Sequence, residues 1–539
     1  MSGTTRRGFL SGAGGALLGG AAVLASPAPA ATAPALVARS DSASTTAVVT
    51  PGDVRYPGLI RGSNQRFVGS PDNIHVVTDA AHVTRAVDQA LAEDKRISVR
   101  SGGHCYENFV ANDQVRVLID TSRMNQVYFD ETHSAYAIEA GATLLDAYHS
   151  LFKGWGVVVP AGSCPSVGAG GFVPNGGYGP LSRSLGLTVD HLYGVEVVTV
   201  DTHGQAHKVL ATRDDNGDLG DLWWAHTGGG GGSFGVVTRY LFRSPDGAAP
   251  EGALLPPPPP EVLIRTVVWP WDTLDETGFA RLVANFGSWH AANSAPDSPG
   301  RHLFAQLKLV NRSAGVVAMS VQVDASTQNA RTLLDEFVSQ VSSGVGTPLG
   351  QPAMLRPWHH ALQWQGFNPP DPSVLRFKIK SAYMRASFPD EQVQALHQNL
   401  TADGNTNDGT LVIISSYGGR INAVDPAATA TAARDSIMKL QYVALWENGA
   451  DDDVNIGWVR DIYSNVYSAT GGVPAPNDVT DGCYIGYPDI DLGDAQWNSS
   501  PTPWNTLYFG ENYARLQKAK ATWDPGDIFR HTQSVRLPD

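Results

Sequence analysis

The sequence predicts an α+β protein with two folded domains, and three observations support this. In its first half, short runs of β-branched residues alternate with stretches whose apolar residues recur at helical spacing. This pattern is typical of a mixed sheet with helices packed on it. A run of five prolines, Pro256 to Pro260, then forms a stiff, extended boundary. Beyond it, strand-like and helical periods return, which predicts an antiparallel sheet covered by helices. A chain of 539 residues also exceeds what one hydrophobic core can hold.

The composition excludes several classes of protein. The chain is 42% apolar and 17% charged, as in soluble globular proteins, and its formal net charge is −14. A nucleic-acid partner would need a basic stripe, so none is expected. Zinc-type cysteine and histidine spacings are absent, and no long apolar run follows the N-terminus. We therefore predict neither a metal site nor a membrane partner.

The N-terminus has the features of an export signal. Thr5-Arg6-Arg7-Gly8-Phe9-Leu10 fits a twin-arginine motif, a Gly/Ala-rich apolar stretch follows, and Ala28-Pro29-Ala30 offers small residues for cleavage. We expect residues 1–31 to be a signal peptide and the protein to be secreted. This pathway exports folded proteins, often with a cofactor already inside. Residues 32–55 are rich in Ala, Ser, Thr and Pro and are expected to be flexible.

Periodicity places the elements of the first domain, residues 56–250. A strand at 74–78 leads to Asp79, a good helix N-cap, and to a helix that runs through Lys95. Strands at 195–200 and 207–210 are typical of a hairpin. Five glycines, 228–232, lie between Trp223-Trp224 and a strand, which favours a buried close approach over a linker. Further strands are expected at 97–100, 115–119, 135–139, 157–159 and 234–238, with a helix at 144–152.

The second domain, residues 255–475, lacks a glycine turn of the phosphate-binding kind and is therefore the candidate substrate domain. Residues 476–539 are expected to return to the first domain. Strands are predicted at 266–269, 304–310, 317–323 and 411–416, and helices at 330–341, 390–399 and 427–440.

Two glycine-rich turns in the first domain end in reactive side chains. Arg100-Ser101-Gly102-Gly103-His104 and Ala161-Gly162-Ser163-Cys164 each follow a short apolar run and end in an imidazole and a thiol. Glycines let a backbone approach a ligand closely, and successive N–H groups in such turns can bind an anion such as a pyrophosphate. Taken singly, either could equally be an ordinary turn with a satisfied histidine or a buried or disulfide-linked cysteine.

Together the turns resemble the two flavin loops of the berberine bridge enzyme-like oxidases. These enzymes have the vanillyl-alcohol-oxidase type of flavin fold, in which a PCMH-type FAD-binding domain of two α+β subdomains joins an α+β substrate domain. The matching segments are R-S-G-G-H at 100–104, A-G-S-C-P-S-V-G-A-G-G at 161–171, G-G-Y-G-P-L-S-R at 176–183, and Y-x-x-x-N-x-x-R-L…D-P…F…Q-S at 508–534. Each alone is modestly specific; in this order the set is strong and spans nearly all of the chain after the signal.

The resemblance implies FAD bound covalently twice, through His104 to the flavin 8α-methyl group and through Cys164 to C6. Thiolate chemistry of this kind depends on a favourable local field. A departure from the family pattern occurs at Phe172 and Asn175, where relatives commonly carry a histidine and more glycine. The residues implied to contact the cofactor also include Arg100, Ser101, Gly102, Gly103, Gly141, Gly162, Ser163, Val167, Gly168, Gly170, Gly171, Gly176, Gly177, Val237 and Asn512.

Oxidation of an alcohol needs a base that takes the hydroxyl proton while hydride leaves carbon. The resemblance points to Tyr484-Ile485-Gly486-Tyr487, with Tyr487 the better match and Tyr484 the alternative. A phenol with a pKa of roughly 10 needs a positive field to act as a base near neutral pH. Lys380 and Arg420 are the candidates for that field. Without the family match, either tyrosine could equally be a core aromatic.

The resemblance further implies a secondary alcohol of a bulky natural product, such as a glycosylated or decorated polyketide, oxidised to a ketone. Val167 matches members that react readily with O2, which implies release of H2O2. Members that oxidise twice carry a second tyrosine where this chain has Ser415, so a single oxidation is expected. Aromatic residues favour such a bulky site weakly, since they are more often core: Trp269, Trp271, Trp358 and Trp364.

Two other functions stay open. One is a carbohydrate oxidase that forms a lactone, whose site would be dense in Gln, Asn and carboxylates. The other is a flavin-free binding protein, which would have no use for both His104 and Cys164. The sequence also allows a Cys105–Cys483 disulfide, which would leave Cys164 as a free thiol.

Overall fold

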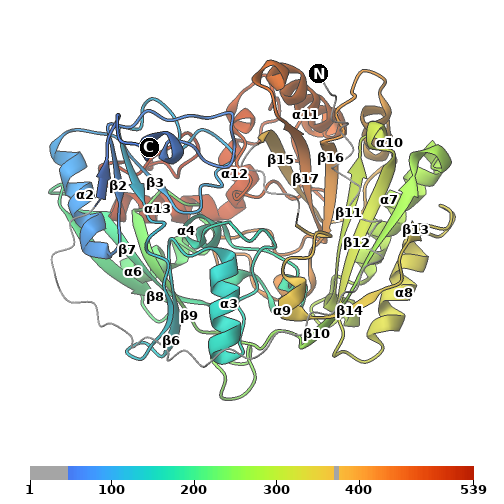
Figure 1. The fold of residues 1–539 in the computed structure, drawn as a ribbon, viewed down its shortest axis with the longest axis horizontal. Coiled ribbons are helices and arrows are strands. Elements are labelled where there is room, and N and C mark those ends of the chain that lie inside the picture. The colour runs from blue at the N-terminus through green and yellow to red at the C-terminus, as the bar shows by residue number, and fades with distance from the viewer. Residues whose placement is uncertain (1–46, 369–374) are drawn as a thin grey trace, which may run out of the picture. The chain divides into compact units, whose positions relative to one another are not determined.

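The structure is a computed structural model that describes residues 47–368 and 375–539. The expected signal peptide, residues 1–31, lies outside the described residues. Within them the strands form three sheets, and the prediction of an α+β fold is confirmed (Figure 1). In the part of the chain that the structure describes, no helix is long and apolar enough to cross a membrane. The same residues hold no group of three or more His, Cys, Asp or Glu side chains suited to a metal ion.

The smallest sheet supports the first glycine turn. Its order is β1 (Ala47–Val49), β2 (Asn73–Val76), β4 (Val117–Asp120) and β3 (Ile97–Arg100), and both β2 and β3 pair in parallel with β4. Helix α2 (Ala80–Ala92) connects β2 to β3, and the Asp79 carboxylate accepts a hydrogen bond from the His82 N–H, as expected of a cap. Strand β1 pairs with β2 and buries Val49, so the expectation of a flexible segment is wrong for residues 47–49.

The second sheet is antiparallel. Its order is β5 (Val127–Asp130), β6 (Ala135–Glu139), β9 (Val236–Phe242), β7 (Leu192–Val200) and β8 (Ala206–Thr212). The predicted hairpin is confirmed as β7–β8. Helix α3 (Leu144–Trp155) follows β6, and α6 (Gly217–Ala225) follows β8. The strand expected at 157–159 is wrong: this segment is buried but belongs to no sheet, and the Val158 N–H donates to Pro256 O instead.

The third sheet lies beyond the proline run. Its order is β13 (Leu349–Gly350), β10 (Glu261–Pro270), β12 (Val316–Asp324), β11 (Leu303–Val310), β16 (Thr410–Ser416), β17 (Met438–Trp446) and β15 (Arg376–Met384), and β14 (Met354–Pro357) also pairs with β10. All of these pairings are antiparallel. The helices on one face are α7 (Glu276–Ala292), α8 (Ala330–Val341), α10 (Asp390–Thr401) and α11 (Asp452–Val466), as Figure 1 shows.

The helix expected at 427–440 is wrong. Residues 427–437 have irregular backbone, and from Met438 the chain is a strand between β16 and β15. The alanines of 427–433 favour a helix intrinsically, but two flanking strands supply a full ladder of hydrogen bonds, and tertiary pairing overrides propensity. This error matters, because β17 carries a lysine of the candidate site.

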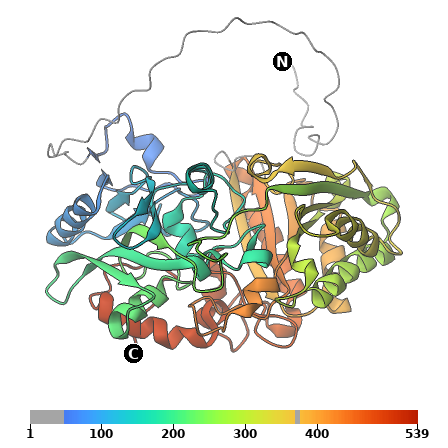
Figure 2. The same cartoon turned by 90° about the horizontal axis from the view of Figure 1, so that it is seen from below.

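The C-terminal segment returns to the first two sheets. It appears in red in Figure 2 and includes α12 (Trp504–Phe509) and α13 (Tyr513–Trp523). The buried Lys520 ammonium donates to Ser233 O at 2.8 Å, and the Val535 N–H donates to Ser233 Oγ at 3.1 Å. Ser233 directly follows the five-glycine run, where Gly228 packs so closely against Thr431 that a Cβ would lie 2.3 Å from its nitrogen. The predicted buried approach is confirmed.

Buried neutral histidines make the fold sensitive to acid. Burial lowers the pKa of His226 to about 4 and that of His290 to about 3. Below about pH 6.5 these histidines therefore bind protons in the unfolded chain but not in the folded chain. The free energy of unfolding falls as a result when the pH drops toward 4. In urea titrations between pH 6.5 and 5 we expect the loss of stability to steepen toward about 1.4 kcal/mol per pH unit for each histidine. His226→Gln should reduce that slope, whereas replacing the exposed His360 should leave it intact; equal slopes in all three proteins would contradict the assignment.

Candidate active site

The two glycine turns lie against each other. A Cβ built on Gly102 would lie 2.4 Å from the Gly168 nitrogen, and one on Gly168 would lie 2.3 Å from the Gly102 nitrogen. His104 Nε2 is 3.0 Å from Ser166 Oγ, and Cys164 Sγ is 3.8 Å from the same hydroxyl. The imidazole and the thiol thus face one point from two loops. Any side chain at Gly102 or Gly168 would force the loops apart.

Several residues predicted to contact the cofactor hold the two loops in place through contacts with the rest of the protein. The buried Arg100 guanidinium pairs with Asp120 and also donates to the carbonyl oxygens of Leu59 and Arg61. Ser101 Oγ donates to Ala140 O at 2.6 Å. A Cβ on Gly141 would lie 1.8 Å from Thr121 O, so only glycine fits there. The Arg100 and Ser101 side chains therefore brace the turn.

The turn after the second loop has its own packing reasons for glycine. Gly176 and Gly177 have φ values of +98° and +69°, and their missing side chains make room for Thr431 and Thr188. Asn175 Nδ2 donates to Gly171 O at 2.6 Å and closes the turn. Val237 lies on β9, and its side chain is partly buried.

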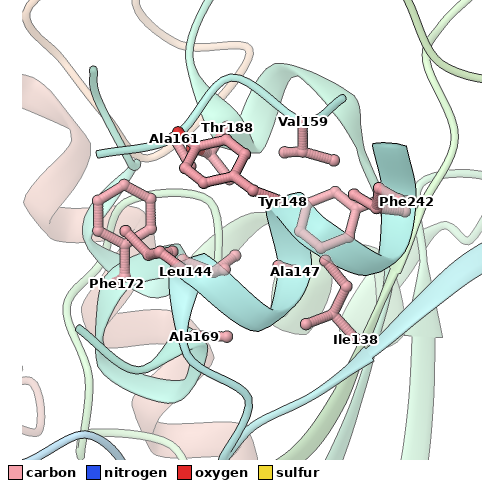
Figure 3. A pocket seen from close by; sticks show the side chains of 12 residues that line it. Ile138, Leu144, Ala147, Tyr148, Val159, Ala161, Ala169, Phe172, Thr188 and Phe242 are labelled. Carbon is pink, nitrogen blue, oxygen red and sulfur yellow. The ribbon is translucent and has the colours of Figure 1, made fainter. Parts of the chain in front are cut away.

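Phe172, the departure from the family pattern, is an apolar filler. Figure 3 shows its ring beside Leu144, Tyr148 and Ala161 at a small cavity beneath the second loop. The cavity has a volume of about 20 Å³ and almost wholly apolar walls, so it suits neither a substrate nor an ordered water. Phe172 thus packs in the apolar core beneath the second loop and supports it.

Tyr487 lies directly against the first loop. Its ring stacks on Tyr106, with centroids 5.3 Å apart and planes at 12°. Tyr484 meets Tyr487 edge-on, with centroids 4.9 Å apart. Tyr106 is two residues past His104. The fold therefore brings both predicted tyrosines to the histidine turn from a segment almost four hundred residues away.

Lys439 is the functional residue that sequence reasoning missed. Its Nζ lies 3.7 Å from the ring centroid of Tyr484 and 4.3 Å from those of Tyr487 and Tyr178. The side chain is buried, and among the described residues it has no hydrogen-bond or ion-pair partner. A cation over three phenol rings is stabilised by their negative faces. The wrong helix prediction for 427–440 hid this lysine, which a strand prediction would have placed on the sheet face with Ser415.

Neither predicted source of the positive field serves Tyr487. Lys380 Nζ is 2.6 Å from Asp489 Oδ2 and 2.9 Å from Asp491 Oδ2, so carboxylates neutralise it. Arg420 is exposed. The assignment of Lys380 and Arg420 is therefore corrected to Lys439.

Burial shifts the pKa values of the two tyrosines and of Lys439 in opposite directions. It raises the pKa of Tyr484 and Tyr487 and lowers the pKa of Lys439 well below its ordinary value. Each charge alone is costly in this environment, but a phenolate and an ammonium side by side compensate one another. Loss of a proton from Tyr487 is thus favoured when Lys439 is charged.

The sheet face around Lys439 is polar. Ser415 and Tyr383 are its cross-strand neighbours, and Gln306 lies opposite Ser415 on β11. Gln441 lies two residues farther along β17. Within the described residues, the amides of Gln306 and Gln441 have no hydrogen-bond partner in the protein. Free amides on one face are suited to hydroxyl groups of a ligand.

The predicted aromatic lining is wrong for three tryptophans. Trp269 and Trp271 are buried in the core, where Trp271 stacks on Phe279 of α7. Trp358 is buried against the edge of Tyr148 on α3. Trp364 is partly buried and meets Phe367 edge-on.

The Cys105–Cys483 disulfide that the sequence allows is not formed in the structure, where Cys105, Cys164 and Cys483 are all free thiols. Cys483 is buried beside the Tyr463 hydroxyl, 3.3 Å away. Burial raises the pKa of Cys105 to about 11, which makes its thiol unreactive. Cys164 is thus the cysteine that faces the histidine turn.

Asn512, predicted to contact the cofactor or substrate, has a structural role as well. Its side-chain amide donates to Pro426 O at 2.8 Å and to Thr429 O at 3.2 Å. It therefore ties the C-terminal segment to the irregular stretch that precedes β17.

The residues present fit a flavin. Glycine-rich turns let a backbone approach a large planar group closely, and their N–H groups suit a pyrophosphate. A histidine and a cysteine face one point, and a tyrosine–lysine cluster stands beside them. Fold and site together define a flavin-linked oxidoreductase.

Comparisons with known proteins agree with this class. Residues 71–208 match the family described as FAD binding domain, and residues 483–536 match the family described as berberine and berberine like. The chain is 45% identical to the aclacinomycin-N/aclacinomycin-A oxidase of Streptomyces galilaeus, over 99% of this chain and 98% of that protein. It is 33% identical to the hexose oxidase of Chondrus crispus, over 90% of this chain and 93% of that protein.

Solved structures show the same kinship. An aclacinomycin oxidoreductase superposes with a TM-score of 0.87 at 47% identity, covering 92% of this chain and all of the other. A glycopeptide hexose oxidase complexed with teicoplanin superposes with a TM-score of 0.86 at 44% identity, covering 91% and 99%. The chain belongs to the berberine bridge enzyme-like family and is an FAD-dependent oxidase.

Proposed function

We propose that this oxidase converts a secondary alcohol of a bulky natural product, such as a glycosylated or decorated polyketide, into a ketone. The observation that carries the proposal is that Tyr487 stacks on Tyr106, two residues past His104, while Lys439 lies over the Tyr487 ring. A base there can meet a substrate hydroxyl beside the cofactor site. Bound FAD would supply the hydride acceptor and the route of the electrons to O2, which yields H2O2.

In this proposal Lys439 stabilises the phenolate form of Tyr487, and the phenolate Oη accepts the hydroxyl proton and becomes a neutral phenol. Tyr106 holds the Tyr487 ring in place by stacking. Ser415, the cross-strand neighbour of Lys439, supplies no further phenol at its position, which favours one oxidation over two. The relatives named above include an aclacinomycin oxidase and a glycopeptide hexose oxidase complexed with teicoplanin, which supports a bulky substrate here.

The second candidate is oxidation of a sugar to a lactone. The free amides of Gln306 and Gln441 beside Lys439 favour a hydroxyl-rich ring, and one relative is a hexose oxidase. A screen that follows H2O2 release over free hexoses, glycopeptides and glycosylated polyketides separates the two. Turnover of hexoses alone, with a lactone as product, would replace the first candidate by the second.

We propose that His104 and Cys164 hold FAD covalently, and acid precipitation tests this. The wild-type pellet should stay yellow, His104→Ala and Cys164→Ala should each keep one covalent bond, and the double variant should release all flavin into the supernatant. Cys105→Ala, next to His104, is the matched control and should behave as wild type. A colourless wild-type pellet would refute covalent attachment.

We also propose that the protein is secreted through twin-arginine export. The motif at residues 5–10 supports this. Replacement of Arg6 and Arg7 by lysine should retain the protein inside the cell, as measured by its amount in the culture medium; undiminished secretion would count against the proposal.

A further inference from the structure

A buried ion cluster lies next to Tyr487 and takes no part in the proposed chemistry. Lys378 Nζ is 2.6 Å from Glu107 Oε1 and 2.7 Å from Asp489 Oδ1. Lys380 Nζ is 2.6 Å from the other Asp489 oxygen. Three acids balance three bases, and all but Arg460 have side chains no more than 3% exposed. The members are Glu107, Lys378, Lys380, Arg460, Asp489 and Asp491.

The cluster joins the histidine turn to the tyrosine segment. Glu107 is three residues past His104, and Asp489 is two residues past Tyr487. Lys378, on β15, contacts both carboxylates and so bridges the two segments. Although burial opposes its charge, Asp489 and Glu107 raise the pKa of Lys378, and it stays protonated.

Asp489 is also held through its backbone. Its N–H donates to Tyr508 Oη at 2.9 Å, and its carbonyl oxygen accepts from Gln533 Nε2 at 2.7 Å. Both carboxylate oxygens are bound to lysines as well. Every polar group of Asp489 therefore has a partner. Because Asp489 is held in place, it fixes the backbone two residues after Tyr487.

Stability alone does not account for such a cluster. Desolvation offsets most of the attraction within buried ion pairs, and apolar residues of similar volume often stabilise as much or more. Ion pairs do impose direction, because their partners must meet at specific atoms. A cluster that spans two halves of a site suits a positioning role.

We propose that Asp489 is a positioning residue that, through Lys378 and Lys380, sets the place of Tyr487 relative to the loop of His104. The proposal rests on the proposed role of Tyr487 as the base. A displacement of about 1 Å at such a group costs up to about 10²-fold in rate. The expected signature is therefore slow chemistry in a folded protein that keeps its FAD.

The test is the double variant Asp489→Asn/Lys380→Met, which removes one charge of each sign and keeps the cluster neutral. We expect the anaerobic rate of flavin reduction by substrate to fall about 10- to 10²-fold, with a smaller change in KM and an unchanged amount of bound FAD. The matched control is Arg376→Met/Asp452→Asn. Arg376 lies on β15 on the same face as Lys378 and Lys380, and its partner Asp452 begins α11. The described contacts of this pair do not include the Tyr487 segment, and the reduction rate of the control should stay at the wild-type value.

A wild-type reduction rate in the folded double variant would overturn the proposal. Should that variant fail to fold, Tyr508→Phe decides, because it removes only the hydroxyl that holds the Asp489 N–H. An unchanged rate there would also overturn it, whereas a several-fold slower rate with a shifted pH profile would support it. Tyr487→Phe separates the proposed base from the proposed positioning role. If Tyr487→Phe and the Asp489 variant both react at the wild-type rate, the assignment of Tyr487 as the base is wrong. If Tyr487→Phe is slow and the Asp489 variant is not, only the positioning role is wrong.

Discussion

Tyr487→Phe is expected to lower the rate of flavin reduction about 10²- to 10⁴-fold, the contribution typical of a general base. The change removes one oxygen and keeps the ring that stacks on Tyr106, so substrate binding and fold should persist. Stopped-flow reduction under anaerobic conditions isolates this step from the reaction with O2. Tyr442→Phe, a buried tyrosine on β17 that is hydrogen-bonded to Tyr467, is the matched control and should react normally.

Two further variants test which of the two tyrosines, Tyr484 or Tyr487, is the base, and whether Lys439 assists it. A near-normal rate for Tyr487→Phe together with a large loss for Tyr484→Phe would move the base to Tyr484. Lys439→Met should slow the reaction at neutral pH and move the acid limb of its pH profile to higher pH. The sign follows from electrostatics: a nearby cation lowers the pKa of a phenol, so its loss raises that pKa and less phenolate forms.

Arg183→Ala is expected to destabilise the fold by at least about 4 kcal/mol. The guanidinium is fully buried on α5 (Ser182–Leu185), and it donates to Leu303 O at 2.9 Å, Asn293 O at 2.7 Å, Gly300 O at 3.1 Å, and Tyr417 O. These four carbonyls belong to the sheet domain beyond the prolines. Each buried acceptor left without a donor costs about 1–3 kcal/mol. Burial lowers the pKa of Arg183 to about 10, so it stays charged at neutral pH.

Urea or thermal unfolding measures this effect directly. Arg183→Lys should rescue little, because a single ammonium cannot reach four carbonyls arranged for a planar fork. Arg331→Ala, at an exposed position of α8, is the control and should leave the midpoint within about 0.5 kcal/mol of the wild type. Equal midpoints for Arg183→Ala and Arg331→Ala would show that Arg183 does not join the two halves of the molecule.

Local patterns were sufficient for much of the fold. Asp79 begins α2 and the glycine turn begins after β3, as predicted, because caps and glycines act through neighbours in the chain. The antiparallel sheet past the prolines was also predictable from alternation, because a strand with one buried face shows a period of two. Errors arose where partners far along the chain decide the conformation, as for 47–49, 157–159 and 427–440.

The sequence by itself therefore determined the class of this protein: two glycine turns with His104 and Cys164, and a tyrosine segment, point to a flavin oxidase. Only the tertiary structure decided how these parts meet. It replaced Lys380 and Arg420 by Lys439, because cross-strand pairing puts the β17 lysine over the tyrosines and leaves Lys380 among carboxylates. Charges act through distance, and distances between remote segments exist only once the chain has folded.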